Sequence, residues 1–414
     1  MTLYHDIKEC RICQNSKLAS VLNFGNFASC GIFPPPNAHS PLLPINLVLC
    51  ENCGLTQLGQ NYNLDHLFRD TYGYRSGLNE TMISHLKALV SEIRNRIALT
   101  PEDVVLDIGS NDGTTLGFYS DAGCKRIGID PTSSQFKEYY QPDITVLPDF
   151  FSGDSYFGTG ITKQAKVITS IAMFYDLPDP NSFVKSIAKV LDTNGVWVFE
   201  QSYLPTMVKL NSFDTICHEH LEYYCLKPVK LLLENNGLKI IDVSLNDANG
   251  GSFRVTAAHT DSSFKENTDA INELLNSEKL EGFLTPAPLQ KLDAFVKDLK
   301  NQVLGFLETA KSNGKLVHGY GASTKGNTLL QLFGVTPELI PAIADRNPRK
   351  FGLTTPGTGI NIISENESRN LKPDYYFVLP WHFRNSFLER ESDFLRAGGS
   401  FVFPLPTFEI VNNA

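Results

Sequence analysis

The chain has 414 residues, a formal net charge of −9 at pH 7 and a hydrophobic fraction of 42%. That length exceeds one ordinary hydrophobic core, so two or three domains are expected. The negative charge argues against binding to nucleic acid or to an anionic membrane. The first ten residues contain no apolar segment of a secretory signal, and no apolar run reaches the ~18 residues that span a bilayer. The sequence therefore predicts a cytoplasmic protein.

Two Cys-x-x-Cys pairs lie near the N-terminus, Cys10/Cys13 and Cys50/Cys53. In a reducing compartment this spacing is more typical of a metal site than of disulfides. Each pair aims two thiolates at one ion, so together they predict a tetrahedral Zn²⁺ site without an open position, which makes the zinc structural. Residues 1–75 are expected to form this zinc-binding domain, rich in loops and broken by the prolines after Phe33.

An amphipathic helix is predicted between Leu78 and Ile97, where apolar residues recur at spacings of mostly three and four. Tyr72 and Tyr74 lie just before it. These two tyrosines either pack on the start of the helix or contact a substrate, and the sequence leaves both interpretations open.

A mononucleotide-binding half is predicted to follow. An apolar strand runs into Asp107, Gly109, Ser110, Asn111 and Gly113. The glycines permit a tight turn under a ligand, ahead of the free N–H groups of a helix. A second strand ends about 20 residues later at Asp130, placed to bind both hydroxyls of a ribose. The pattern is Asp-x-Gly-x-x-x-Gly and differs from the Gly-x-Gly-x-x-Gly of dinucleotide sites.

The order of these elements resembles class I S-adenosylmethionine-dependent methyltransferases. The resemblance implies a donor site that also includes the loop after the third strand and the fourth strand, at Asp149, Phe150, Phe151, Ser170 and Ala172. The fifth strand is expected at 196–202, and alternating strands at 239–246 and 252–259 form an antiparallel hairpin at the sheet edge. This domain is expected to span residues 76–260.

Residues 261–312 have a helical pattern and are interpreted as a connector, and a second α/β unit follows over 313–414. Its first strand leads into Gly319, Gly321 and Gly326, a glycine-rich loop that suits a phosphate group, with Lys325 beside it. Asp345 lies 24 residues after Gly321, roughly where dinucleotide folds keep a ribose-binding acid. The loop suits the pyrophosphate of a nucleotide-activated substrate. It also suits a nicotinamide cofactor, although its glycine spacing differs from that of dinucleotide-binding sites.

The segment Asp214–Tyr224 concentrates two imidazoles, a thiol and several carboxylates in eleven residues. It follows the predicted fifth strand, so we expect it in the loops beyond that strand's carboxyl end. Open α/β sheets bind their ligands at this place, and catalytic residues gather on such loops. The sequence therefore predicts that this segment carries acid–base chemistry.

Over essentially its whole length the chain resembles the sugar-nucleotide C-methyltransferases that build branched deoxysugars. The resemblance rests on both cysteine pairs, Glu219–Tyr224, Asn249–Arg254, Gly321–Thr328, Asp345–Pro348 and Leu379–His382. It implies an α/β protein: a class I methyltransferase core that binds S-adenosylmethionine, a zinc-binding domain before it, and a second Rossmann-like domain that helps to bind a nucleotide-activated sugar. The oligomeric state is expected to be a monomer or a small homo-oligomer. The substrate contacts that the resemblance implies are Tyr72, Tyr74, Tyr175, Asp176, Cys217, Asn249, Ser252, Arg254, Ser323, Lys325, Asn327, Asp345, Lys350, Trp381 and His382.

Members of the family methylate a ring carbon, typically the third, of a dTDP-linked 3-keto or 4-keto deoxysugar. A carbon next to a ketone must lose a proton, which requires a general base and stabilisation of the enolate oxygen. The family's Glu-His pair falls on Glu219 and His220, so we predict His220 as the base and Glu219 as the group that polarises the site. His218 and Tyr224 are the reserve candidates.

The sequence departs from the family's pattern at two positions. Cys217 replaces a tyrosine, and Asp176 stands where other members carry a histidine. Both positions face the sugar in the family, so these departures put the sugar and the methylated carbon in question. The alternatives are O- or N-methylation of a nucleotide sugar and an NAD-dependent oxidoreductase that uses the C-terminal glycine loop.

Overall fold

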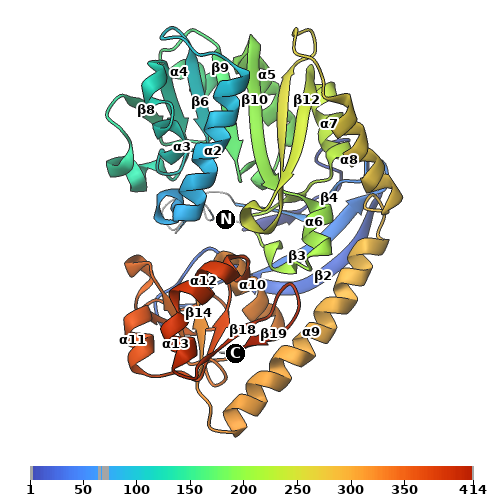
Figure 1. Ribbon diagram of the computed structural model, residues 1–414. Coiled ribbons are helices and arrows are strands. Elements are labelled where there is room, and N and C mark those ends of the chain that lie inside the picture. Colours follow the sequence, from blue (N-terminus) through green and yellow to red (C-terminus); the bar gives the residue numbers. More distant parts are fainter. Residues whose placement is uncertain (1–2, 64–66, 68–73, 413–414) are drawn as a thin grey trace.

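The computed structural model describes residues 3–63, 67 and 74–412 (Figure 1). These residues form four sheets, of two, four, six and seven strands. The seven-stranded sheet lies in the upper part of Figure 1 and the six-stranded sheet below it. Among the described residues, no helix combines the length and the apolar character that a membrane crossing requires.

The N-terminal region is built on an antiparallel sheet, not mainly on loops. Its long strands are β2 (Leu18–Ala28) and β3 (Leu42–Cys50), and β4 (Thr56–Leu58) follows. Leu43, Ile45, Leu47 and Leu49 alternate inward along β3, which is the pattern of a half-buried strand. The prolines after Phe33 fall in the connection between β2 and β3, so they interrupt no strand. A separate pair joins β1 (Tyr4–Asp6) to β5 (Gln60–Tyr62).

The seven-stranded sheet has the order β12-β13-β10-β9-β6-β7-β8. The five strands from β10 to the edge strand β8 are parallel, while β13 is antiparallel to both of its neighbours. Every strand predicted for this unit is present, which confirms the class I methyltransferase core. The bounds are β6 (Val104–Ile108), β7 (Lys125–Ile129), β8 (Ile144–Leu147), β9 (Ala165–Ile171), β10 (Leu191–Ser202), β12 (Leu238–Asn246) and β13 (Ser252–His259).

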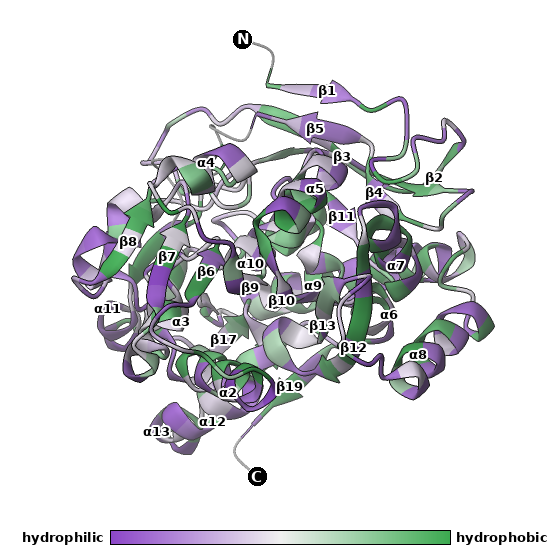
Figure 2. Cartoon of the chain, turned by 90° about the horizontal axis from the view of Figure 1, so that it is seen from above, coloured by the Kyte–Doolittle hydropathy of each residue, from purple (hydrophilic) through white to green (hydrophobic). Residues whose placement is uncertain are grey.

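Helices cover both faces of that sheet. One face packs against α2 (Glu80–Arg96), which begins two residues after the predicted start. The other face packs against α5 (Pro180–Val190) and α7 (Leu226–Asn235). Short helices α3 (Thr114–Gly117), α4 (Gly153–Gly158) and α6 (Leu204–Lys209) complete this unit. Figure 2 shows green, hydrophobic interior strands and an outer helix, α8 (Thr268–Leu280), banded in purple and green.

The six-stranded sheet has the order β16-β15-β14-β17-β18-β19, with β19 antiparallel to five parallel strands. This is the second Rossmann-like unit that the sequence predicts. Strands β16 (Asn361–Ser364) and β19 (Glu409–Val411) were not predicted, because each is short and partly exposed. The other bounds are β14 (Val317–Tyr320), β15 (Ala342–Asp345), β17 (Tyr375–Val378), β18 (Ser400–Phe403), α10 (Thr324–Phe333), α11 (Glu365–Asn370), α12 (Arg384–Arg390) and α13 (Ser392–Arg396).

The long helix α9 (Ala287–Ser312) connects the two large sheets along one side of the molecule (Figure 1). Its buried residues Leu292, Val296, Leu299 and Val303 recur at helical spacing. They belong to one apolar core that runs from β2 and β3 through α9 to the six-stranded sheet. The N-terminal sheet is therefore packed against the C-terminal unit as well as against the methyltransferase core.

Candidate functional site

A cavity of about 1080 Å³ lies between the two large sheets. Asp107 and Asp130, at the carboxyl ends of β6 and β7, line it from one side. Gly321, directly after β14, and Asp345, the last residue of β15, line it from the other. Open α/β sheets bind ligands at the carboxyl ends of their strands. The fold therefore directs the binding edges of both Rossmann-like units into one space.

The segment Asp214–Tyr224 connects this cavity to the zinc region. It begins in a short 3-10 helix, Phe213–Thr215, and ends in β11 (Glu222–Tyr223). Strand β11 pairs antiparallel with β4 and extends the N-terminal sheet, with Glu222 opposite Gln57 and Tyr223 opposite Thr56. The Trp381 indole N–H of the C-terminal unit donates to Asp214 Oδ2 at 2.9 Å. All three parts of the chain therefore hold this segment.

His220 lines the cavity. Its Nδ1–H donates to the Thr215 carbonyl at 2.7 Å, and the Tyr175 ring lies edge-on at 4.3 Å between centroids. Burial, with a smaller effect of the Lys325 charge, lowers the pKa of His220 to about 4. The imidazole is therefore neutral at pH 7. Because Nδ1 carries the proton, Nε2 has a free lone pair and can accept a proton.

Glu219 also lines the cavity, although its side chain is buried. Its Oε1 accepts a hydrogen bond from the Gly31 N–H at 2.8 Å. Burial is the main cause that raises the pKa of Glu219 above its ordinary value. The donor belongs to the connection after β2, so the N-terminal region positions this carboxyl group directly.

Replacing Gly31 with alanine is expected to destabilise the protein. A Cβ at this position would lie 2.5 Å from Glu219 Oε1, so the 2.8 Å hydrogen bond must break. Loss of the donor to a buried carboxyl group should lower the free energy of unfolding by about 1–3 kcal/mol. Gly305→Ala in α9 is the matched control, since its Cβ would meet nothing within 4 Å. Urea unfolding measures both, and a G31A midpoint equal to that of G305A would contradict the role of this contact.

The two reserve base candidates, His218 and Tyr224, are not among the residues that line the cavity. The His218 ring is buried against the N-terminal sheet, with Nε2 3.1 Å from the Leu43 carbonyl oxygen and its face toward the edge of Tyr62. The Tyr224 ring is fully buried and stacks on Phe174 at 5.4 Å. Neither lines the cavity. His220 is the candidate base that remains.

The donor side of the cavity is built by the loop after β6. Asp130 Oδ2 accepts from the Asn111 N–H at 2.7 Å, and Oδ1 accepts from the Thr132 N–H at 2.6 Å. Gly109 has φ +71°, and a Cβ there would lie 2.9 Å from Met173 Cγ, so only glycine fits. The residues predicted for the donor that line the cavity are Asp107, Gly109, Ser110, Asn111, Asp130, Phe150, Phe151 and Ala172.

Three residues predicted for the donor are not on the cavity wall. Asp149 is exposed and its Oδ1 accepts from the Phe150 N–H at 2.8 Å, so it shapes its own loop. Ser170 is buried and accepts from the Trp197 indole N–H at 3.1 Å. Gly113 is the left-handed residue that precedes α3. In this structure these residues contact the donor loop or the sheet, and their contact with the donor stays a prediction.

The opposite wall is formed by the N-terminus of α10 and two lysines. Ser323 caps this helix, its Oγ accepting from the Gly326 N–H at 3.0 Å. Lys325 Nζ donates to the Asn249 carbonyl at 2.7 Å, and Lys350 Nζ donates to the Ala322 carbonyl at 2.7 Å. Helix N–H groups together with ammonium groups favour an anion. This wall therefore suits a phosphate-bearing ligand.

The other residues predicted to contact substrate divide into two groups. Tyr72 lies outside the described residues. Those that line the cavity are Tyr74, Tyr175, Asp176, Asn249, Ser323, Lys325, Asp345, Lys350 and His382. Cys217, Ser252, Arg254, Asn327 and Trp381 do not line it. For example, Asn327 Nδ2 donates to the Cys30 carbonyl at 2.7 Å, and Arg254 Nε donates to Glu200 Oε2 at 2.9 Å. The contacts predicted for these five residues with the substrate stay a prediction.

Glu200 is a residue on the cavity wall that the sequence analysis missed. Its carboxylate accepts from Arg254 Nε at 2.9 Å and from Asn246 Nδ2 at 2.8 Å, and it is paired with His85. Burial acts to raise the pKa of Glu200, but the bonds and charges of His85 and Arg254 outweigh it and lower the pKa. A single acid inside the apolar run of β10 was the signal that could have identified it, because a buried charge requires partners.

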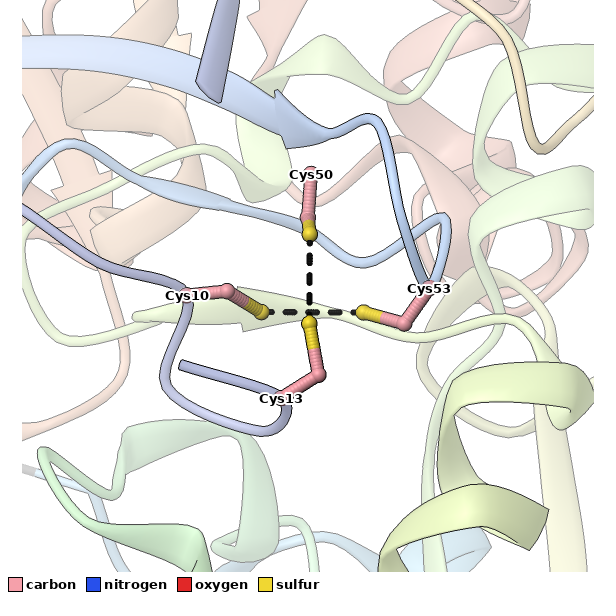
Figure 3. A group of neighbouring side chains, drawn as sticks. All are labelled: Cys10, Cys13, Cys50 and Cys53. Carbon is pink, nitrogen blue, oxygen red and sulfur yellow. Dashed lines mark hydrogen bonds between the residues drawn. The ribbon is translucent and has the colours of Figure 1, made fainter. Parts of the chain in front are cut away.

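The four predicted zinc ligands converge (Figure 3). The sulfur atoms of Cys10, Cys13, Cys50 and Cys53 all lie within 4.8 Å of one another. Cys10 Sγ lies 3.6 Å from Cys53 Sγ, and Cys13 Sγ lies 3.4 Å from Cys50 Sγ. Four sulfurs at ~2.3 Å from one Zn²⁺ would be about 3.8 Å apart in a tetrahedron. The cluster therefore fits a structural zinc ion with no open position.

Arg11, between two of these cysteines, connects the zinc site to the segment Asp214–Tyr224. Its buried guanidinium donates to the carbonyls of Leu58 and Gln60, each at 2.7 Å. Arg11 Nε also lies 3.4 Å from Glu222 Oε1 in β11. The cysteine loop, β4 and β11 are thus connected through one buried cation.

Three family models match the chain in succession. They are described as "Putative zinc binding domain" for residues 10–68, "Methyltransferase domain" for 82–243 and "C-methyltransferase C-terminal domain" for 247–406. The chain is also 29% identical over 412 residues to C-methyltransferase NovU of Streptomyces niveus. This alignment covers 98% of this chain and 97% of that protein.

Similarity to solved structures covers less than half of the chain. A chain of the complex between the Haloferax volcanii Trm112 methyltransferase activator and a methyltransferase is 15% identical, covers 44% of this chain and 94% of its own length, and has a TM-score of 0.36. The mitomycin 7-O-methyltransferase MmcR is 15% identical, covers 44% and 55%, and has a TM-score of 0.34. The succession of three family models and the full-length relative show that the chain is an S-adenosylmethionine-dependent C-methyltransferase with an N-terminal zinc-binding domain.

Proposed function

We propose that the protein methylates a ring carbon of a nucleotide-activated keto-deoxysugar, as a step in branched-sugar biosynthesis. The observation that carries this proposal is the composition of the cavity. Donor-loop residues such as Asp130 line one wall, the N-terminus of α10 and Lys350 line the other, and His220 lines the same space. A C-methyltransferase that accepts a diphosphate-linked sugar needs these three features in one space.

The donor wall fits S-adenosylmethionine. Asp130 still has free lone pairs after its bonds to the loop, so its carboxylate can accept from ribose hydroxyls. Gly109 allows the backbone to approach a ligand closely, and Phe150 and Phe151 offer apolar surface to an adenine ring. When bound, the donor supplies a methyl group that is electrophilic because it is attached to a sulfonium.

The second wall fits the diphosphate of a sugar nucleotide. Lys325 and Lys350 each use one proton in a bond to a carbonyl, so other N–H donors remain for phosphate oxygens. The free N–H groups at the start of α10 add to this positive potential. Asp345 is held by the Ala322 N–H at 2.7 Å and lies where a ribose would follow.

His220 acts as the base in this proposal. Its Nε2 takes the proton from the ring carbon next to the ketone, and the C–H electron pair becomes the enolate. That carbon then bonds to the methyl group as the methyl–sulfur bond breaks, and the protonated His220 returns its proton to solvent. Since Nδ1–H stays bonded to the Thr215 carbonyl, the ring keeps one orientation throughout.

Incubation with isotopically labelled S-adenosylmethionine and a panel of dTDP- and GDP-keto-hexoses tests this function. One sugar nucleotide should gain the mass of one methyl group. Without the donor, deuterium from solvent should enter the carbon next to the ketone, because only C-methylation requires that carbanion. A product methylated on oxygen or nitrogen without such exchange, or no product from any member of the panel, would contradict the proposal.

A further inference from the structure

Asp176 is a partly buried acid on the cavity wall to which the proposed mechanism gives no role. It ends the short 3-10 helix Phe174–Asp176, directly after β9. Asp176 lines the cavity, and its Oδ1 is buried with no hydrogen-bond partner in the described part of the chain. A buried acid without a partner is costly unless a ligand completes it or it loses its charge.

The loop that carries Asp176 contacts the segment that carries His220, the proposed base. The Tyr175 carbonyl accepts from the Leu221 N–H at 2.7 Å, so the loop after β9 runs alongside the catalytic segment. The Tyr175 ring contacts the His220 ring at 4.3 Å between centroids. The residues adjacent to Asp176 and to His220 are thus directly bonded. Asp176 and His220 both line the cavity, and the two segments that carry them are bonded to each other.

No positive charge neutralises Asp176 in the described part of the chain. The titratable groups that face it are Cys217, Glu219, Glu222 and Tyr223, all from the catalytic segment. Each is either neutral or negative. The nearby cation Arg11 faces Glu222 at 3.4 Å instead. Burial, and then the charges of Glu219 and Glu222, raise the pKa of Asp176 well above its usual range. A diphosphate substrate would add more negative charge to this cavity, so the acid is expected to keep its proton.

We propose that Asp176, as a neutral carboxylic acid, donates its O–H to the ketone oxygen of the substrate while His220 removes the proton from the adjacent carbon. The proton remains on Asp176, and the hydrogen bond strengthens as the oxygen gains the charge of the enolate. Positioned donors of this kind stabilise developing oxyanions, and a carboxylic acid kept neutral by its surroundings can serve as one. This inference rests on the function proposed above.

Asp176→Asn is the informative variant, because an amide is a neutral donor of similar shape that cannot ionise. We expect D176N to keep kcat within about threefold of the wild type at pH 7. Asp176→Ala, which has no donor, should lose about 100-fold, as is typical when one oxyanion donor is removed. Asp154→Asn in α4 is the control, since its side chain is 94% exposed and pairs with Lys189 at the surface. Binding of S-adenosylhomocysteine should be the same in all variants, which verifies folding.

The pH profile tests the protonation state. The wild-type rate should fall as pH rises through the pKa of Asp176, because the ionised acid cannot donate, and D176N should lack this fall. A D176N variant as inactive as D176A, or one with the same alkaline fall as the wild type, would overturn the inference.

An infrared comparison at pH 7 separates this inference from the proposed function. The wild type should show a protonated-carboxyl band that D176N removes, whether or not a sugar substrate is present. If no sugar nucleotide is methylated, the proposed function fails, and this band still decides the state of Asp176. Absence of the band shows an ionised Asp176 and overturns the inference by itself.

Discussion

Replacing His220 with asparagine should lower kcat by about 10²- to 10⁴-fold, the usual contribution of a general base. The asparagine amide N–H can still donate to the Thr215 carbonyl in place of Nδ1, so the segment should keep its conformation. It has no group that can accept the proton of the ring carbon. Deuterium exchange into the substrate without the donor should therefore disappear, while binding of S-adenosylhomocysteine is unchanged.

The pH dependence of kcat/KM in the wild type is an independent test of the role of His220. His220 has its pKa lowered to about 4, so it is neutral and able to accept a proton above that pH. The acid limb of kcat/KM should therefore fall near pH 4 and not near the ordinary histidine value of about 6.5.

His259→Gln is the matched control for H220N. His259 lies in β13, away from the cavity, with Nε2 3.1 Å from the Leu191 carbonyl oxygen. This variant should retain both exchange and methylation. Exchange that persists in H220N would show that another group is the base.

Removing the zinc should lower the stability of the fold and loosen the segment Asp214–Tyr224. Structural zinc sites contribute an apparent binding free energy of about 10–16 kcal/mol in small zinc-binding peptides, and that energy is coupled to folding. Cys50→Ser combined with Cys53→Ser removes two of the four ligands. Bound zinc should fall from about one ion per chain to none, and the unfolding temperature should drop with it.

The coupling to catalysis follows from the connections of β11. Strand β4 begins three residues after Cys53 and pairs with β11, and Arg11 bonds the carbonyls of Leu58 and Gln60 while facing Glu222. Loss of the ion should loosen these contacts and expose residues 216–224 to amide hydrogen exchange. Cys124→Ser, outside the cluster, should keep both the zinc and the protection. Full protection of 216–224 in the zinc-free variant would contradict this coupling.

Long helices and strands in which apolar residues recur at a regular spacing were predictable from sequence, because this spacing is a property of the local sequence. The strands of the seven-stranded sheet and helix α2 were identified within a few residues of their ends. Strand β11, with two residues, has no period to detect and exists only because β4 presents an unpaired edge. The same reason explains the missed strands β16 and β19, which are short and depend on their neighbours.

Site residues were predictable from sequence where their spacing brings the side chains together. They were less predictable where the local path of the backbone decides which way a side chain points. The four cysteines illustrate the first case, because each Cys-x-x-Cys turn aims its own two sulfurs. His218 and His220 illustrate the second: they are two residues apart, yet one faces the N-terminal sheet and the other the cavity. Arg254 likewise bonds Glu200 and not a ligand, since a buried acid in β10 requires that cation.

The sequence by itself determined the two Rossmann-like units, the zinc ligands and the donor loop with Asp130, since these depend on local pattern and spacing. Only the tertiary structure decided that Gly31 holds Glu219, that β11 joins the segment Asp214–Tyr224 to the N-terminal sheet, and that the charged groups facing Asp176 are the acids Glu219 and Glu222. These features arise from contacts between residues far apart in the chain. Burial in the folded protein, and not local sequence, sets which of those groups meet and what charge they carry.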